Sequence, residues 1–137
     1  MGERVGFSLR IHMDEFYLPE EIVEWLDLKK SEYLSKLIEH LGPDDFQFHE
    51  FGQFDDFLPM TLAAPDWSTE RVEDGQRVKT YCRSFHDGKF FHQVVVGALI
   101  PDQSNNDVFI PILSFITKKE NLLKLFSDGQ AGKRLLS

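Results

Sequence analysis

Apolar and polar residues alternate near the start of the chain, which is the pattern of a half-buried β-strand. Residues 4–13 predict the first strand, because apolar side chains occupy every second position: Val5, Phe7, Leu9 and Ile11. Residues 76–85, 90–101 and 107–117 predict three more strands. Pro111 has no backbone N–H for a sheet ladder. We therefore expect the strand over 107–117 to lie at a sheet edge or to carry a bulge.

Helical spacing of apolar residues appears between residues 18 and 42. Pro19 suits a first helical turn, and Gly42 followed by Pro43 is a strong stop signal. Lys29 and its neighbour interrupt the apolar stripe, so we expect a break near residues 27–31 and two short helices. A short amphipathic helix is predicted from residue 118 onward, followed by a flexible tail over 128–137.

The Phe-rich stretch 46–59, FQFHEFGQFDDFLP, is the unusual feature of the chain. Residues 46–51 alternate and predict a strand. After Gly52 the aromatic residues recur at every third position, which indicates a helical turn or an irregular loop that ends at Pro59. Residues 60–75 follow as a predicted long connection, and such connections are often functional.

Asp87-Gly88 is a favoured pair for a two-residue hairpin turn between the strands over 76–85 and 90–101. That turn would pair Ser84 with Phe91 and Arg83 with His92. In this register His86 and His92 lie on opposite faces of the sheet.

These elements predict one α+β domain over residues 1–137. We expect an antiparallel sheet of four to five strands, with the N-terminal helices packed on one face and a short C-terminal helix. A chain of this length has room for a substantial core.

Charge is distributed unevenly along the chain. The formal net charge is −8, and residues 37–70 alone carry eight acidic residues and no Lys or Arg. Such a field repels nucleic acid and anionic membranes and attracts basic proteins. With no signal-peptide core and no long apolar run, we expect a cytoplasmic protein that binds neither nucleic acid nor a membrane.

Motifs for catalysis and metal binding are absent from the sequence. Cys82 is the single cysteine and is predicted to be a small buried residue within a strand. No Gly-rich phosphate loop, nucleophile elbow or HExxH spacing occurs. Asp55 and Asp56 lack the alternating carboxylate spacing of a calcium loop. We therefore expect no cofactor, no metal and no catalytic residue.

The leading hypothesis is a small acidic, non-enzymatic interaction protein that binds a basic protein, by analogy in size and charge to inhibitors, immunity proteins and chaperones. Apolar anchors and surrounding acids would form its docking surface. The candidate partner-binding residues are Glu50, Phe54, Asp55, Asp56, Phe57, Asp66 and Trp67. The opposing interpretation buries the phenylalanines in the core and leaves the acids as a solvated rim.

Two alternatives complete the sequence analysis. One is a ligand-binding or enzymatic domain with a pocket between the sheet and residues 60–75, lined by His49, Glu50 and His92 or Arg83. The other is a homodimer that pairs through an exposed edge over residues 107–117.

Overall fold

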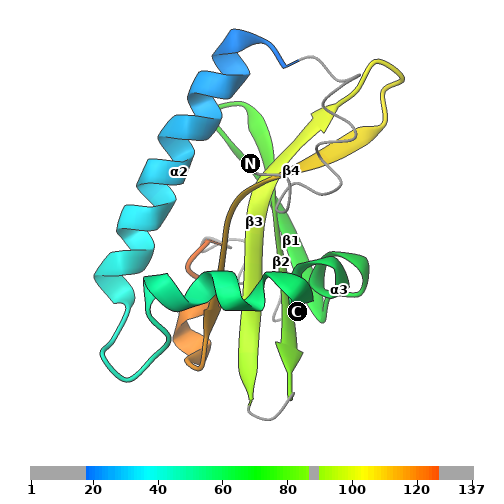
Figure 1. The fold of residues 1–137 in the computed structure, drawn as a ribbon. Helices are drawn as coiled ribbons and strands as arrows, with labels where there is room; N and C mark the ends of the chain where they lie inside the picture. Colours follow the sequence, from blue (N-terminus) through cyan, green and yellow to red (C-terminus); the bar gives the residue numbers. More distant parts are fainter. Residues whose placement is uncertain (1–17, 87–89, 127–137) are drawn as a thin grey trace.

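The computed structural model describes residues 18–86 and 90–126 (Figure 1). The predicted strand over 4–13, the Asp87-Gly88 pair and the tail over 128–137 lie outside these residues. The elements in chain order are α2 (Glu20–His40), the 3₁₀ helix η1 (Phe48–Phe57), α3 (Leu58–Ala63), β1 (Trp67–Glu73), β2 (Gln76–Phe85), β3 (Phe91–Pro101), β4 (Asp107–Thr117) and the 3₁₀ turn η2 (Glu120–Leu122).

The four strands form one antiparallel sheet in the order β1-β2-β3-β4, so each strand pairs with the next in sequence. This confirms the α+β class and the antiparallel sheet. Within the described residues β4 lies at a sheet edge, and its pairing with β3 shifts register between Val96 and Gly97, where Gly97 faces Pro111. Both consequences expected of Pro111 are therefore present.

Gly97 is required by a close approach of β4. A Cβ atom added there would lie 2.3 Å from the carbonyl oxygen of Ile110 and 2.7 Å from the Phe109 ring. Both contacts are far closer than packed atoms allow. The bulge and the position of the Phe109 ring therefore require a glycine at residue 97.

The prediction of a long connection over residues 60–75 is wrong. Residues 58–63 form α3, and Trp67–Glu73 form β1. β1 returns into β2 through Asp74 and Gly75, both with positive φ (56° and 81°). The flanking residues Glu73 and Gln76 pair directly. An Asp-Gly pair with this geometry is a two-residue hairpin turn of the type that suits twisted strands.

The predicted strands over 76–85 and 90–101 form β2 and β3, but their predicted register is wrong by one residue. Ser84 pairs with His92 and Phe85 with Phe91. A shift of one residue moves every side chain of a strand to the other face. His92 therefore shares a sheet face with His86, contrary to the sequence-based expectation.

α2 is one continuous helix, so the predicted break near residues 27–31 is wrong. Lys29 does not interrupt the buried face because its ammonium group is paired there. Its Nζ lies 3.1 Å from Glu32, 3.2 Å from Glu73 and 3.2 Å from Asp74. Trp25 also donates to Asp74, over 3.1 Å. α2 thus holds the β1–β2 turn by its buried cation.

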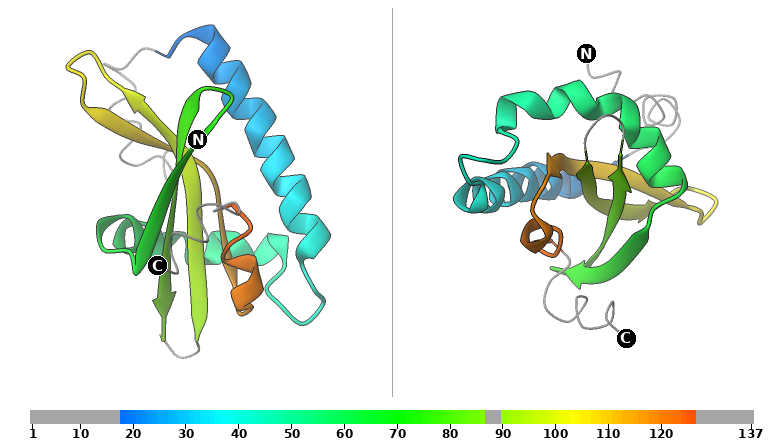
Figure 2. Two further views of the ribbon diagram at one scale, coloured as in Figure 1. Left: turned by 180° about the vertical axis from the view of Figure 1, so that it is seen from behind. Right: turned by 90° about the horizontal axis from the view of Figure 1, so that it is seen from below.

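The two faces of the sheet carry separate apolar clusters. The α2 face includes Tyr33 and Leu37 of the helix and Val94 and Val96 of β3. The other face includes Phe85 and Phe91, and it is covered by η1 and α3. Figure 2 shows η1 and α3 passing over the sheet on the side away from η2. The members of this second cluster are Phe46, Phe85, Phe91 and Ile116, with Phe51, Phe54 and Phe57 packed against them.

The predicted C-terminal helix is reduced to η2, a single 3₁₀ turn. The apolar residues of this segment still pack on the sheet, since Leu122 and Phe126 are both buried in the α2-face cluster. Arg71 and Thr80 donate hydrogen bonds to the carbonyl oxygen of Phe126. These bonds fix the end of the described chain against β1 and β2.

Candidate functional site: the outer surface of η1

The Phe-rich stretch folds as η1, a 3₁₀ helix, and the strand predicted over residues 46–51 is wrong. In a 3₁₀ helix residues i and i+3 lie above one another. Phe48, Phe51, Phe54 and Phe57 are spaced by three, so this repeat places them along one side of η1. The helix start is capped reciprocally: the Gln47 backbone N–H donates to Glu50 Oε1 over 2.7 Å, and the Gln47 side chain accepts from the Glu50 backbone.

Phe54 and Phe57 turn toward the sheet and are half-buried. The ring of Phe54 lies 4.9 Å from that of Phe91, and the ring of Phe57 lies 4.9 Å from that of Phe85. Both pack with an edge-to-face or tilted geometry typical of a core. These two candidate anchors therefore hold η1 on the sheet.

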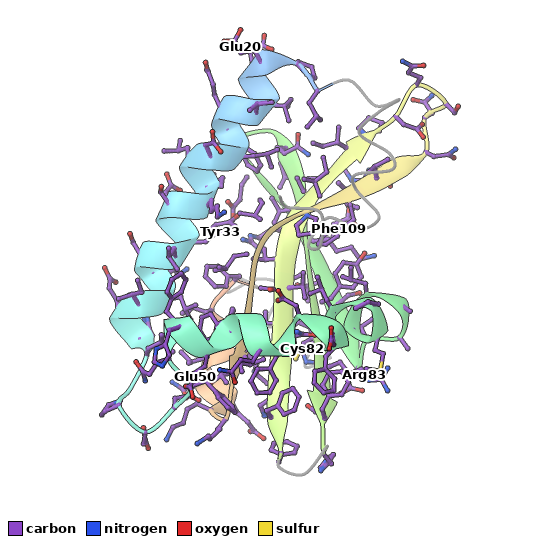
Figure 3. The ribbon with its side chains drawn as sticks, in the orientation of Figure 1. Glu20, Tyr33, Glu50, Cys82, Arg83 and Phe109 are labelled. Carbon is purple, nitrogen blue, oxygen red and sulfur yellow. The ribbon has the colours of Figure 1, made fainter. Side chains whose placement is uncertain are left out.

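The side of η1 away from the sheet is exposed and acidic, and the ring of Phe48, the first member of the phenylalanine row, is exposed as well. We define the η1 surface as six exposed residues, which are Phe48, His49, Gln53, Asp55 and Asp56 of η1 and Met60 of α3. Phe48 is 55% exposed and Met60 is 42% exposed. Glu50 lies beside them, half-buried by its capping bond, and is labelled in Figure 3.

Buried polar contacts support η1 from below. Gln93, 2% exposed, donates to the carbonyl oxygen of Phe54 over 3.0 Å and accepts from Thr61 over 2.6 Å. Asp45 accepts hydrogen bonds from Thr117 and from the backbone of Lys118. These contacts tie η1, α3 and the connection from α2 to the ends of β3 and β4.

Several acids of residues 37–70 are engaged within the chain. Asp44 pairs with Lys119 over 2.8 Å, and Glu70 pairs with Arg77 over 2.8 Å. Lys119 holds the pKa of Asp44 below its usual range, and the carboxylates of Glu70 and Asp107 raise the pKa of Arg77. The acidic run of the sequence is thus partly neutralised by basic residues from the C-terminal half.

Asp66 and Trp67 lie at the start of β1, away from the other candidates. Asp66 accepts a hydrogen bond from the backbone N–H of Ser84 over 2.8 Å. Trp67 is half-buried and packs against the α2-face cluster, which lies on the opposite side of the sheet from Phe54. The structure therefore brings Glu50, Asp55 and Asp56 together on η1 and separates them from Trp67.

The residues of the alternative pocket do not converge. His49 is exposed on η1, whereas His92 is buried on the α2 face. Arg83 donates to the carbonyl oxygens of Met60 and Ala64, each over 3.3 Å, and so caps α3. Among residues 18–86 and 90–126, no group of three His, Cys, Asp or Glu side chains is arranged to hold a metal.

A contact that sequence reasoning missed joins Ser84 and His92. Ser84 Oγ lies 2.6 Å from His92 Nδ1. Burial lowers the pKa of His92, although Glu120, Asp66 and Asp45 act to raise it. A nucleophilic serine needs a base that a third group orients. His92 Nε2 has no such partner within the described chain. The hairpin register determines this contact, because Ser84 and His92 are paired residues. A two-residue turn at Asp87-Gly88 predicted Ser84 opposite Phe91 instead.

Cys82 is buried in β2, as the sequence predicted. Burial raises the pKa of its thiol to about 12, so the thiolate that reacts or binds metal is scarce at neutral pH. Within the described ranges, no helix combines the length and the apolar character needed to cross a bilayer.

The chain matches no protein-family model, no curated protein and no solved structure.

Proposed function

We propose that this protein is an interaction module that docks a basic protein partner on the η1 surface. The observation that carries the proposal is the division of η1 into two sides. One side is fixed to the sheet by Phe54 and Phe57, and the other presents acids. The ring of Phe48, at the start of η1, is exposed beside these acids. An apolar anchor among carboxylates is the composition that recognises a basic surface.

Charge supports the choice of a basic partner. Residues 37–70 contain no Lys or Arg, so no cation of this segment competes for Asp56. Asp56 is exposed and makes no hydrogen bond or ion pair with another described residue. Lys119 and Arg83 are engaged elsewhere, by Asp44 and by the carbonyl oxygens at α3.

Rigidity supports the choice of η1 over the rest of the surface. A docking site that is already ordered loses little conformational entropy on binding. η1 is held by the aromatic packing beneath it and by the buried amide of Gln93. The apolar positions that remain exposed, Phe48 and Met60, are then presented in a fixed arrangement.

The first test compares variants of the chain as bait in lysate of the source organism, with quantitative mass spectrometry. Asp56→Lys and Phe48→Ser alter the η1 surface. Glu24→Lys and Val23→Ser make matched changes at exposed positions of α2. We expect one basic protein to be enriched by the wild type and both α2 variants and lost from both η1 variants. Equal recovery by all four variants, or recovery of no basic protein, would reject the proposal.

A further inference from the structure

His92 is the second residue of β3 and is only 3% exposed. Its Nδ1 is bonded to Ser84 Oγ, and its Nε2 is buried with no hydrogen-bond partner among the described residues. Buried polar atoms are nearly always satisfied in folded proteins, and each exception costs stability. Among the described residues the site therefore offers no acceptor for a second N–H of the ring, which favours the neutral imidazole.

Titratable groups from four directions act on this imidazole: Glu120 of η2, Asp66 before β1, Asp45 after α2, and His86 after β2. None of the three carboxylates bonds to the ring. Asp45 is taken up by the backbone of Phe46 and Lys118 and by Thr117, and Asp66 is taken up by the backbone of Ser84. The carboxylates act to raise the pKa and His86 acts to lower it, and burial outweighs them.

We propose that His92 is a pH-sensitive latch at the end of the sheet where β2 ends and β3 begins. This end stays closed while the imidazole is neutral, and it opens when the ring binds a proton. An imidazolium carries two N–H donors, and a buried ion without full pairing is costly. Hydration of the ring requires the ends of β2 and β3 to separate, which breaks the contact with Ser84.

Opening at His92 would reach η1 through one neighbouring residue. His92 pairs with Thr117 across β3 and β4. Thr117 in turn donates to Asp45, which anchors the connection that leads from α2 into η1. The latch goes beyond the docking proposal and does not depend on it, because the motion is defined within the free protein.

The direction of the pH effect follows from linkage. The folded pKa of His92 lies below the ordinary value of 6.5, so the unfolded chain binds the proton first as pH falls. The stabilisation is therefore fully present above about pH 6.5 and declines as the pH drops below it.

The test is an NMR titration of the wild-type imidazoles and backbone amides from about pH 7.5 to 4.5, a range that contains ordinary histidine titration. We expect His92 to titrate with a pKa below 6.5, the ordinary value for a histidine. The amides of Ser84 and Thr117 should then broaden or shift with the midpoint of His92. Titration of His92 at or above 6.5, or amide changes that do not share its midpoint, would overturn the proposal.

A variant provides the second measurement. His92→Asn keeps a polar side chain and cannot take up a proton in this range. We expect it to lose the amide changes near Ser84 and Thr117, whereas the control His49→Asn should retain them. Persistence of those changes in His92→Asn would contradict the latch. If that variant does not fold, the wild-type titration decides the question by itself.

Discussion

At the residue scale, a few buried polar side chains determine where η1 lies. Gln93 stands in an otherwise apolar run of β3, FHQVVVGALIP, and is buried like its neighbours. Its amide bonds to both η1 and α3. An amide in this position is satisfied only when the two helices cross the sheet at one place, so it specifies their position as well as stabilising it.

Replacement of Gln93 tests this role. Gln93→Leu keeps the volume but leaves the buried carbonyl oxygen of Phe54 without its donor. We expect the free energy of unfolding to fall by about 1–3 kcal/mol, the usual cost of an unsatisfied buried group. The matched control is Gln53→Leu on the exposed side of η1, where a change within about 0.5 kcal/mol is expected. Urea unfolding of both variants gives the comparison, and equal effects would contradict the role.

The sequence identified the importance of some single residues and missed others. Pro111 and Cys82 behave as predicted, because lack of a backbone N–H and small apolar size act locally. Gln93 and Lys29 were missed or misjudged, since their polar groups are paired by residues far away in the chain. Tertiary partners of this kind leave no local pattern.

At the element scale, the three-residue spacing of phenylalanine explains the conformation of η1. A strand would require spacing of two and an α-helix an average of 3.6. Phe51, Phe54 and Phe57 align most closely in a 3₁₀ helix, and 3₁₀ helices are usually three or four residues long. The rarity of a ten-residue example is why the alternation at Phe46 and Phe48 favoured a strand instead.

The turn between β1 and β2 shows a signal that was present in the sequence and was not used. Asp74-Gly75 is the same favoured pair as Asp87-Gly88, and the residues before it alternate in burial. A two-residue turn at Asp87-Gly88 predicted the wrong register for β2 and β3. Without a turn at Asp74-Gly75, the residues of β1 were predicted to be a loop. Local turn chemistry therefore predicts the sheet only when each such pair is considered.

Substitution of two glycines tests the account of this turn. Gly75 has φ +81°, and side chains are disfavoured in that conformation by about 1–2 kcal/mol. We expect Gly75→Ala to lower the free energy of unfolding by about 1–2 kcal/mol and to lower the melting temperature accordingly. Gly52→Ala in η1 is the control, because a Cβ there meets nothing within 4 Å. The control should be neutral or slightly stabilising. Equal destabilisation of the two variants would argue against the turn.

At the scale of the whole molecule, folding changes the meaning of the acidic segment. In the sequence its eight acids appear as one uninterrupted field. In the structure Asp44 and Glu70 are paired with cations, and Asp45 is buried as an acceptor. The acidic surface that remains is therefore narrower than the sequence suggested and is concentrated on the outer side of η1.

The fold class and three of the strands were predictable, and the site was predictable only in part. The acids Asp55 and Asp56 were expected at the surface and are exposed there. Phe54 and Phe57 were candidates for the same surface and lie against Phe91 instead. Composition identifies the segment that contains both the exposed acids and the buried phenylalanines. The type of helix determines whether each residue faces the sheet or the solvent.

The measurement that tests the docking proposal most directly is the association rate of the recovered partner at several salt concentrations. We expect fast association with the wild type that slows as salt rises, because exposed charges are screened. Asp56→Lys should associate more slowly and with a flatter salt dependence, and Glu24→Lys should behave like the wild type. Identical rates and salt dependence for the wild type and Asp56→Lys would contradict docking on the η1 surface.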